Sequence, residues 1–224
     1  MHVIPATNLK VPVPSSEWMQ KLKTSMAVFA GPGDPLAACL YDQSWGGRQA
    51  VHCIYSVGLR TLIDPKGLDK YLDKPFCWRF IAGGHKNMTT AAGCWTTHEL
   101  HGSDAKVMAA FQGPEMAEIL ANTEQLNDLK ELTEHAADNY EMRVMRIPAL
   151  YIEAFWLRCT SRGDLMVPYG LLLDGKGFIK VGAKGRLTKN KAYPVAEFLR
   201  IVGKAARQRL AAEDIAPLAR RTGA

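Results

Sequence analysis

Four residues with metal-binding or catalytic side chains lie close together in the sequence: Cys94, His98, His101 and Asp104. If this segment is helical, His98 and His101 share one face, because side chains three residues apart are neighbours on a helix. Imidazole nitrogens hold borderline metals such as zinc, so the spacing predicts a metal site at His98 and His101. In a strand the two histidines would point to opposite faces, and the prediction would fail. Two polar loop histidines are the alternative interpretation.

Cys94 is also a candidate catalytic nucleophile, with His98 as the nearest histidine, because a thiolate held by a histidine attacks carbonyl carbons. Gly93-Cys94-Trp95 resembles the nucleophile segment of papain-type cysteine proteases over these three residues. Met88 stands where that family has a glutamine, and His135 matches its histidine by order alone. A small cysteine-dependent hydrolase that uses Cys94 or Cys39 with a histidine is therefore one hypothesis, and a packed free thiol is the alternative.

Glu153 is the third candidate catalytic residue, because it lies in the middle of the most apolar stretch of the chain. An unpaired ionised carboxylate is expensive to bury, so Glu153 requires a basic partner, protonation or a water-lined pocket. Arg79 and Arg143 are the candidate partners. A structural Arg–Glu pair gives the same pattern as a catalytic carboxylate, and both interpretations stay open.

The segment from Gly175 to Lys191 contains four glycines, six basic residues and no acidic residue. Glycines let a backbone approach phosphates closely and lysines neutralise them, so the segment is a candidate site for nucleic acid or an anionic ligand. It lacks the P-loop pattern and the aromatic residues that alternate with basic ones in single-strand binders. A solvated hairpin loop is the alternative. The candidate binding residues are Lys176, Lys180, Lys184, Arg186, Lys189 and Lys191.

The net charge of +6 is unevenly distributed along the 224 residues. From Arg158 to the end there are fourteen Lys or Arg against five Asp or Glu, a local charge of +9, which leaves −3 for the first 157 residues. A polarised charge favours an acidic partner. The favoured hypothesis is a non-enzymatic binding protein that recognises a protein or other acidic macromolecule through its basic C-terminal third. Nucleic-acid binding is an alternative, and no cofactor is expected.

The cysteine pattern and the hydropathy indicate a cytoplasmic protein that does not enter a membrane. The five cysteines are odd in number and form no C-x-x-C motif, which is typical of free thiols in a reducing compartment. No apolar run approaches the roughly 18 residues of a membrane span, and the first residues lack the pattern of an export signal.

The elements that must position these residues predict an α+β fold with a mostly antiparallel sheet. Apolar side chains occupy both odd and even positions from Ala149 to Cys159, so both faces of a strand here would be apolar. This pattern indicates a central strand that is covered on both sides. Thr160-Ser161-Arg162-Gly163 has turn chemistry, and Asp164 to Tyr169 runs back as the second strand. This central hairpin, at about residues 145–169, is expected to be covered by helices.

The flanking segments complete the prediction. We expect an extended arm over residues 1–14, one domain over residues 15–212 and a flexible tail over residues 213–224. A strand is predicted at 76–81, with its antiparallel partner at 89–97. The stretch 49–63 fits both periodicities, and its length favours a helix. The other predicted helices begin at Glu17, Asp34, Lys66, Ala105, Thr123 and Val195, the last one ending at Ala212.

Overall fold

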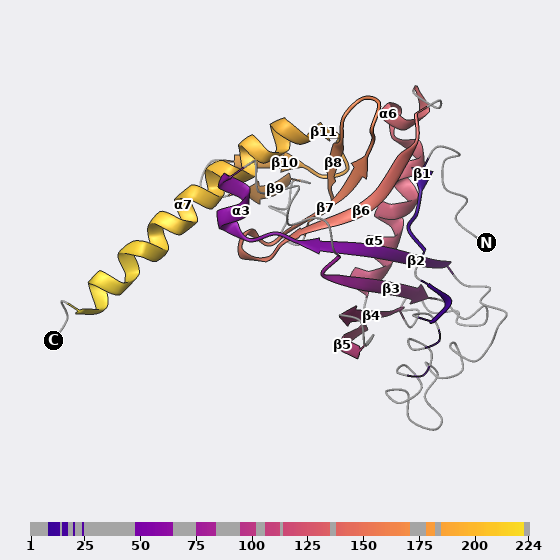
Figure 1. The fold of residues 1–224 in the computed structure, drawn as a ribbon, viewed down its shortest axis with the longest axis horizontal. Coiled ribbons are helices and arrows are strands. Elements are labelled where there is room, and N and C mark those ends of the chain that lie inside the picture. The colour runs from indigo at the N-terminus through magenta and orange to yellow at the C-terminus, as the bar shows by residue number, and fades with distance from the viewer. Residues whose placement is uncertain are drawn as a thin grey trace. The chain divides into compact units, whose positions relative to one another are not determined.

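The structure is a computed structural model in which β-strands and helices combine in an α+β fold, as the sequence predicted (Figure 1). The larger sheet is mixed, mostly antiparallel and not closed, with the strand order β11-β8-β7-β6-β2-β3-β4-β5 and with β1 paired to β6. The residues that the structure describes are 9–13, 15–17, 20, 24, 48–64, 75–83, 95–101, 106–112, 114–134, 138–170, 178–181 and 185–221.

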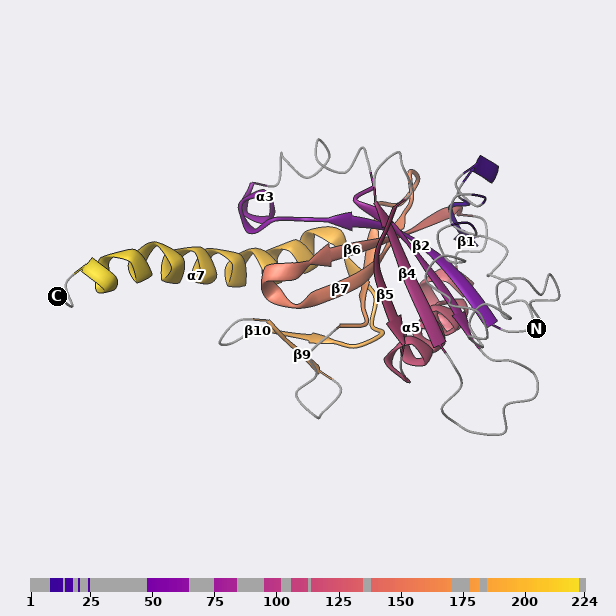
Figure 2. The same cartoon turned by 90° about the horizontal axis from the view of Figure 1, so that it is seen from below.

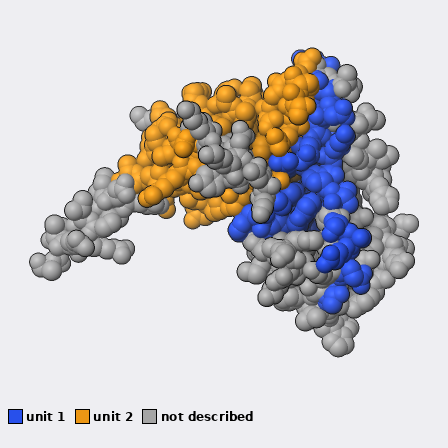
Figure 3. Space-filling model, viewed as in Figure 1, with its two compact units in different colours: residues 1–54, 75–143 blue, residues 55–74, 144–224 orange. Residues whose placement is uncertain are grey.

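The chain divides into two compact units (Figure 3). Unit 1 comprises residues 1–54 and 75–143, and unit 2 comprises residues 55–74 and 144–224. Two strands, β2 and β6, contribute residues to both units. The prediction of one domain over residues 15–212 therefore stays a prediction.

Unit 1 is built on an antiparallel meander of strands (Figure 2). The register places Val51 opposite Phe80, Phe80 opposite His98, and His98 opposite Ala110, with a bulge in the last pairing. The short first strand runs parallel to the start of β6. The strands are β1 (Leu9–Lys10), β2 (Arg48–Ser56), β3 (Cys77–Gly83), β4 (Trp95–His101), β5 (Lys106–Gln112) and β6 (Tyr140–Ile147).

Helix α5 (Pro114–Gln125) covers this meander by packing against β3 and β4. A hydrogen bond of 3.1 Å joins His52 Nε2 on β2 to Thr123 Oγ1 on α5, and the same hydroxyl donates to the carbonyl of Ile119. The turn after α5 consists of η1 (Leu126–Asp128) and α6 (Lys130–Thr133), which bury Leu126 and Leu132.

Unit 2 is centred on β7 (Ile152–Arg158), whose residues 152–157 are all buried. This confirms the prediction of a strand covered on both sides. β7 pairs with β8 (Leu165–Pro168) in antiparallel register, with Phe155 opposite Val167, so the central hairpin is confirmed as well. In the turn between them, Gly163 has a φ of 91°, a backbone conformation that favours glycine. The short strand β11 (Tyr193–Pro194) extends the sheet beyond β8.

The last helix, α7 (Val195–Arg221), buries the predicted apolar positions Phe198, Val202 and Ala206. At Gly203 it meets the helix α3 (Leu59–Ile63), and a Cβ atom at that position would lie 3.3 Å from the carbonyl oxygen of Leu62. The absence of a side chain thus permits the close approach of the two helices. α7 also contacts the hairpin of β9 (Phe178–Val181) and β10 (Gly185–Thr188).

Three helix predictions were wrong or misplaced. The stretch 49–63 is mainly the strand β2, because residues 52–55 are buried on both faces and such a strand has no diagnostic periodicity. The stretch from Ala105 to Phe111 is mainly β5, because pairing with β4 outweighs its helical pattern. Thr123 does not begin a helix, since it lies inside α5, which starts at Pro114.

Two boundaries also differ from the prediction. Pro148 lacks an amide hydrogen and begins the 3-10 turn η2 (Pro148–Leu150), so the central strand starts at Ile152 rather than at Ala149. Tyr151 is therefore not a strand residue. α7 continues to Arg221, beyond the predicted end at Ala212 and into the segment predicted to be a flexible tail.

Several predicted elements fall on parts of the chain that the structure does not describe. Among the residues of the helix predicted from Glu17, the described ones at positions 17, 20 and 24 are helical. The strand predicted at 76–81 and its antiparallel partner are confirmed as β3 and β4, although residues 89–94 lie outside the described part. The helices predicted from Asp34 and Lys66 lie outside it too. Of the helices that can be traced, none combines the length and the apolar character of a membrane span.

The contact at Gly203 yields a stability prediction. Gly203→Leu should lower the free energy of unfolding by about 2 kcal/mol, because the new side chain cannot fit between α7 and the Leu62 carbonyl. Urea denaturation followed by circular dichroism measures this. The control is Ala196→Leu on the exposed side of the same helix, which should change stability by less than about 0.5 kcal/mol. Equal effects of the two substitutions would show that α3 and α7 are not tightly packed at Gly203.

Candidate functional site

The carboxylate of Glu153 is buried in unit 2, where its residue is 1% exposed and both carboxylate oxygens accept hydrogen bonds. Arg146 Nε donates to Oε1 over 2.7 Å, and the Tyr169 hydroxyl donates to Oε2 over 2.7 Å. A basic partner was predicted, but the arginine is neither Arg79 nor Arg143: it is Arg146, on the strand that directly precedes Glu153. These are the contacts of a structural ion pair, and a catalytic role of Glu153 stays a prediction.

The main chain of Glu153 ties the same elements together. Its carbonyl oxygen accepts hydrogen bonds from the amides of Tyr169 and Gly170, each over 3.1 Å. Gly170 has a φ of 64°, which turns the chain at the end of β8 so that both amides reach one oxygen. The side chain and the backbone of one residue thus fix β7 to β6 and to the end of β8.

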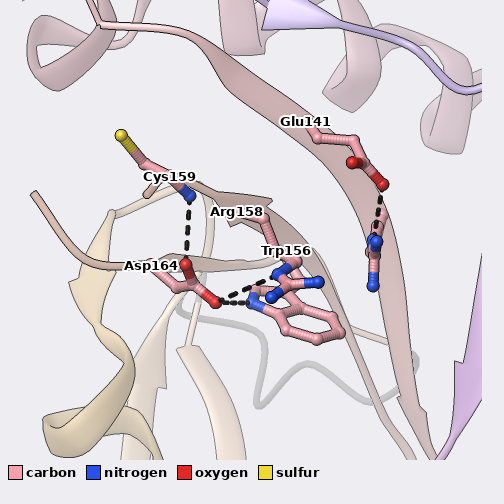
Figure 4. Close-up of polar contacts among 6 residues, drawn as sticks. Glu141, Trp156, Arg158, Cys159 and Asp164 are labelled. Atoms are coloured by element: carbon pink, nitrogen blue, oxygen red, sulfur yellow. Dashed lines mark hydrogen bonds and ion pairs between the residues drawn. The ribbon is translucent and has the colours of Figure 1, made fainter. Parts of the chain in front are cut away.

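A second Arg–Glu pair has nearly the same geometry but a different environment (Figure 4). Arg143 Nε lies 2.6 Å from Glu141 Oε1, and both residues belong to β6 in unit 1. The Glu141 side chain is 45% exposed, against 1% for that of Glu153. Solvent screens the exposed pair, so it provides a natural comparison for the buried one.

Asp164 organises the turn of the central hairpin (Figure 4). Its Oδ2 accepts a hydrogen bond of 2.7 Å from Trp156 Nε1, and its Oδ1 accepts one of 3.0 Å from the amide of Cys159. Arg158 Nε lies 3.9 Å from Oδ2, and the guanidinium stands over the Trp156 ring. The carbonyl of Asp164 accepts from the amide of Val195, where α7 begins. Sequence reasoning missed this role, although an acid directly after a turn glycine is a usable signal.

The cysteine and histidine hypotheses receive no geometric support from the described residues. Cys94 and Cys39 lie outside the described part of the chain. His98 and His101 are on β4, so the helical segment on which the metal prediction depended is a strand. The described residues contain no cluster of three or more potential metal ligands. Their free thiols are buried: Cys53, Cys77 and Cys159.

Four of the six predicted binding residues lie on the β9–β10 hairpin and the turn after it. Lys180 on β9 is the register partner of Arg186 on β10, which places two basic positions opposite each other. Arg186 is exposed and Lys189 is half-buried. Lys191 is exposed, with its Nζ 5.1 Å from the centre of the Tyr193 ring. The remaining two, Lys176 and Lys184, lie outside the described residues.

Helix α7 adds cations that the predicted site did not include. Arg200, Lys204 and Arg207 are exposed and follow one another at spacings of four and three residues, which places them in one stripe along the helix. The helix contacts β10, so these cations and Arg186 stand on neighbouring elements of unit 2. We call the exposed set Arg186, Lys191, Arg200, Lys204 and Arg207 the basic surface.

No protein-family model matches this chain, and searches of curated proteins and of solved structures found no match. The functional argument therefore depends on the residues themselves.

The two Arg–Glu pairs yield a matched prediction. Glu153→Gln should lower the free energy of unfolding by about 2 to 3 kcal/mol, because it leaves the guanidinium of Arg146 facing a neutral group inside unit 2. Glu141→Gln removes the same charge from the exposed pair and should change stability by less than about 1 kcal/mol. Chemical denaturation of both variants measures the difference. Equal stability losses would contradict the assignment of Glu153 as a buried structural anchor.

Proposed function

We propose that this protein binds an acidic macromolecule through the basic surface of unit 2, without catalysing a reaction on it. The observation that carries the proposal is the exposed stripe of Arg200, Lys204 and Arg207 on α7. The exposed Glu197 stands three residues before Arg200 and offsets part of its charge, but between Phe198 and Ala212 the sequence contains no acidic residue.

The rest of α7 supports the proposal because it holds the stripe in a defined orientation. The opposite face of the helix buries Phe198, Val202 and Ala206, so rotation about the helix axis would expose apolar surface. The spacing of the stripe corresponds to about 6 Å from Arg200 to Lys204 and about 10 Å from Arg200 to Arg207 along the axis. Cations at such intervals bind an extended polyanion better than a single small anion.

The hairpin beside α7 enlarges this cationic area. Arg186 and Lys191 are exposed, and the ammonium of Lys191 lies near the ring of Tyr193. The Tyr193 hydroxyl in turn accepts a hydrogen bond of 2.9 Å from the amide of Thr188, which fixes the position of the ring. The Lys191 side chain is thereby restrained, so it loses less conformational entropy on binding than an unrestrained lysine would lose.

The hypothesis of a cysteine-dependent hydrolase rests on Cys94 or Cys39, which lie outside the described residues. Among the described thiols, Cys159 is typical: it is buried and lies 3.1 Å from Ser161 Oγ. A buried thiol packs as a small apolar group and reacts slowly. No described residue favours the hydrolase over binding.

A pair of charge reversals tests the proposal. Lys204→Glu should weaken binding to polyglutamate and to an oligothymidylate of about 16 nucleotides by roughly tenfold at low salt, and should flatten the dependence of affinity on salt. Fluorescence anisotropy with labelled probes measures both. Lys130→Glu changes the net charge equally at an exposed position of α6 in unit 1, and should alter affinity less than about twofold. Equal losses in both variants, or no binding by the unaltered protein, would overturn the proposal.

A further inference from the structure

The connection between β6 and β7 carries an exposed, wholly uncharged tip formed by residues 148–151. Pro148 and Ala149 are exposed, and Tyr151 is 58% exposed although it is one of the largest side chains of unit 2. Most large aromatic side chains in the described residues are buried instead, among them Phe155, Tyr169 and Tyr193. The ring of Tyr151 is thus available to a ligand.

Tyr151 is also held in an unfavourable backbone conformation. Its φ is 53° and its ψ is 45°, the left-handed region that non-glycine residues seldom occupy. The amide of Tyr151 donates to the carbonyl of Pro148, and the Arg146–Glu153 ion pair closes the base of the connection. Strain of this kind persists where the surrounding structure enforces it, and it is concentrated at functional sites. The tip therefore holds the backbone of Tyr151 in one defined conformation.

Exposed cations stand on elements that adjoin the β6–β7 connection within unit 2. The amide of Val57 donates to the carbonyl of Arg146, so the start of α3 lies beside the end of β6. α3 carries the exposed Arg60 and packs on α7 at Gly203. Arg200 stands three residues before Gly203 and Arg207 four residues after it, so both lie on the same side of α7 as Gly203. In Figure 1 the turn between β6 and β7 lies next to α3, and in Figure 2 α7 lies between the two.

We propose that the acidic partner is a single-stranded nucleic acid, which stacks a base on Tyr151 and places phosphates near Arg60, Arg200 and Arg207. The inference rests on the function proposed above and names the partner class. Exposed aromatic rings beside a cationic track are the two components of single-strand binding sites. A polyacidic protein segment would use the cations alone, because carboxylate side chains gain nothing from the face of a tyrosine ring.

The test compares three polyanions in one buffer: oligothymidylate, an abasic sugar-phosphate oligomer of equal length, and polyglutamate. The unaltered protein should bind oligothymidylate more tightly than the abasic oligomer. Tyr151→Gly should weaken oligothymidylate binding by about tenfold and leave abasic binding within about twofold. Tyr151→Phe keeps the ring and should bind as the unaltered protein does. Oligouridylate in place of oligothymidylate then decides between RNA and DNA as the preferred strand.

The variants also separate loss of binding from loss of folding. Glycine adopts the backbone angles of Tyr151 without strain, so Tyr151→Gly should be at least as stable as the unaltered protein. If Tyr151→Gly binds oligothymidylate normally, or if bases add nothing to abasic binding, the inference is overturned while the proposed polyanion binding stands. Binding of polyglutamate alone would identify an acidic protein instead. If the unaltered protein binds none of the three polymers, both proposals fail.

Discussion

The buried contact between Arg146 and Glu153 is the constraint on which unit 2 depends. β7 is buried on both faces, and a carboxylate in such a strand is tolerable only with a cation and a hydroxyl at hydrogen-bonding distance. Arg146 and Tyr169 supply these from the two neighbouring strand regions. A slip of β7 by one residue would remove both partners, because it would turn the Glu153 side chain to the opposite face of the sheet. We infer that the pair specifies strand register more than it adds net stability.

Asp164 links the central hairpin to α7, the helix that carries the exposed cations. Its side chain holds Trp156 and the amide of Cys159, and its carbonyl holds the first amide of α7. The helix therefore leaves the sheet at a fixed point. Because its apolar stripe must face inward, Arg200, Lys204 and Arg207 on the same helix must face outward. The position of these three cations is thus a consequence of how the central hairpin is closed.

The Tyr151 tip depends on the same buried pair. The connection between Ile147 and Ile152 is short, and the ion pair holds its two ends together. With its base fixed, the tip keeps Tyr151 in a left-handed conformation that an unconstrained chain would leave. The buried ion pair, the strained Tyr151 and the elements that carry the cations are therefore linked within unit 2.

The sequence predicted the elements whose signals are local and missed those that depend on strand pairing. β7 was predicted from apolar residues at both odd and even positions, and the turn with Gly163 from its turn chemistry. The start of the last helix at Val195 was predicted as well. β2 and β5 were mistaken for helices, because a strand buried on both faces has no distinctive period and β5 is defined by its pairing with β4.

The same limit explains the errors at the candidate site. Choosing Arg146 as the partner of Glu153 requires knowing that β6 and β7 form a hairpin around Pro148, and β6 was not recognised as a separate strand. The basic character of the C-terminal third was readable from composition. The link from β6 through α3 to α7 was not predictable, because it arises from contacts between segments far apart in the sequence.

Native-state hydrogen exchange of the amides of Tyr169 and Gly170 tests the central claim most directly. Both amides donate to the carbonyl of Glu153, so their exchange reports the opening of β7 from the end of β8. If Glu153 anchors unit 2, these amides exchange only through global unfolding, with the same free energy as the β7 amides. Exchange at a free energy well below the global value, while β7 stays protected, would contradict the account.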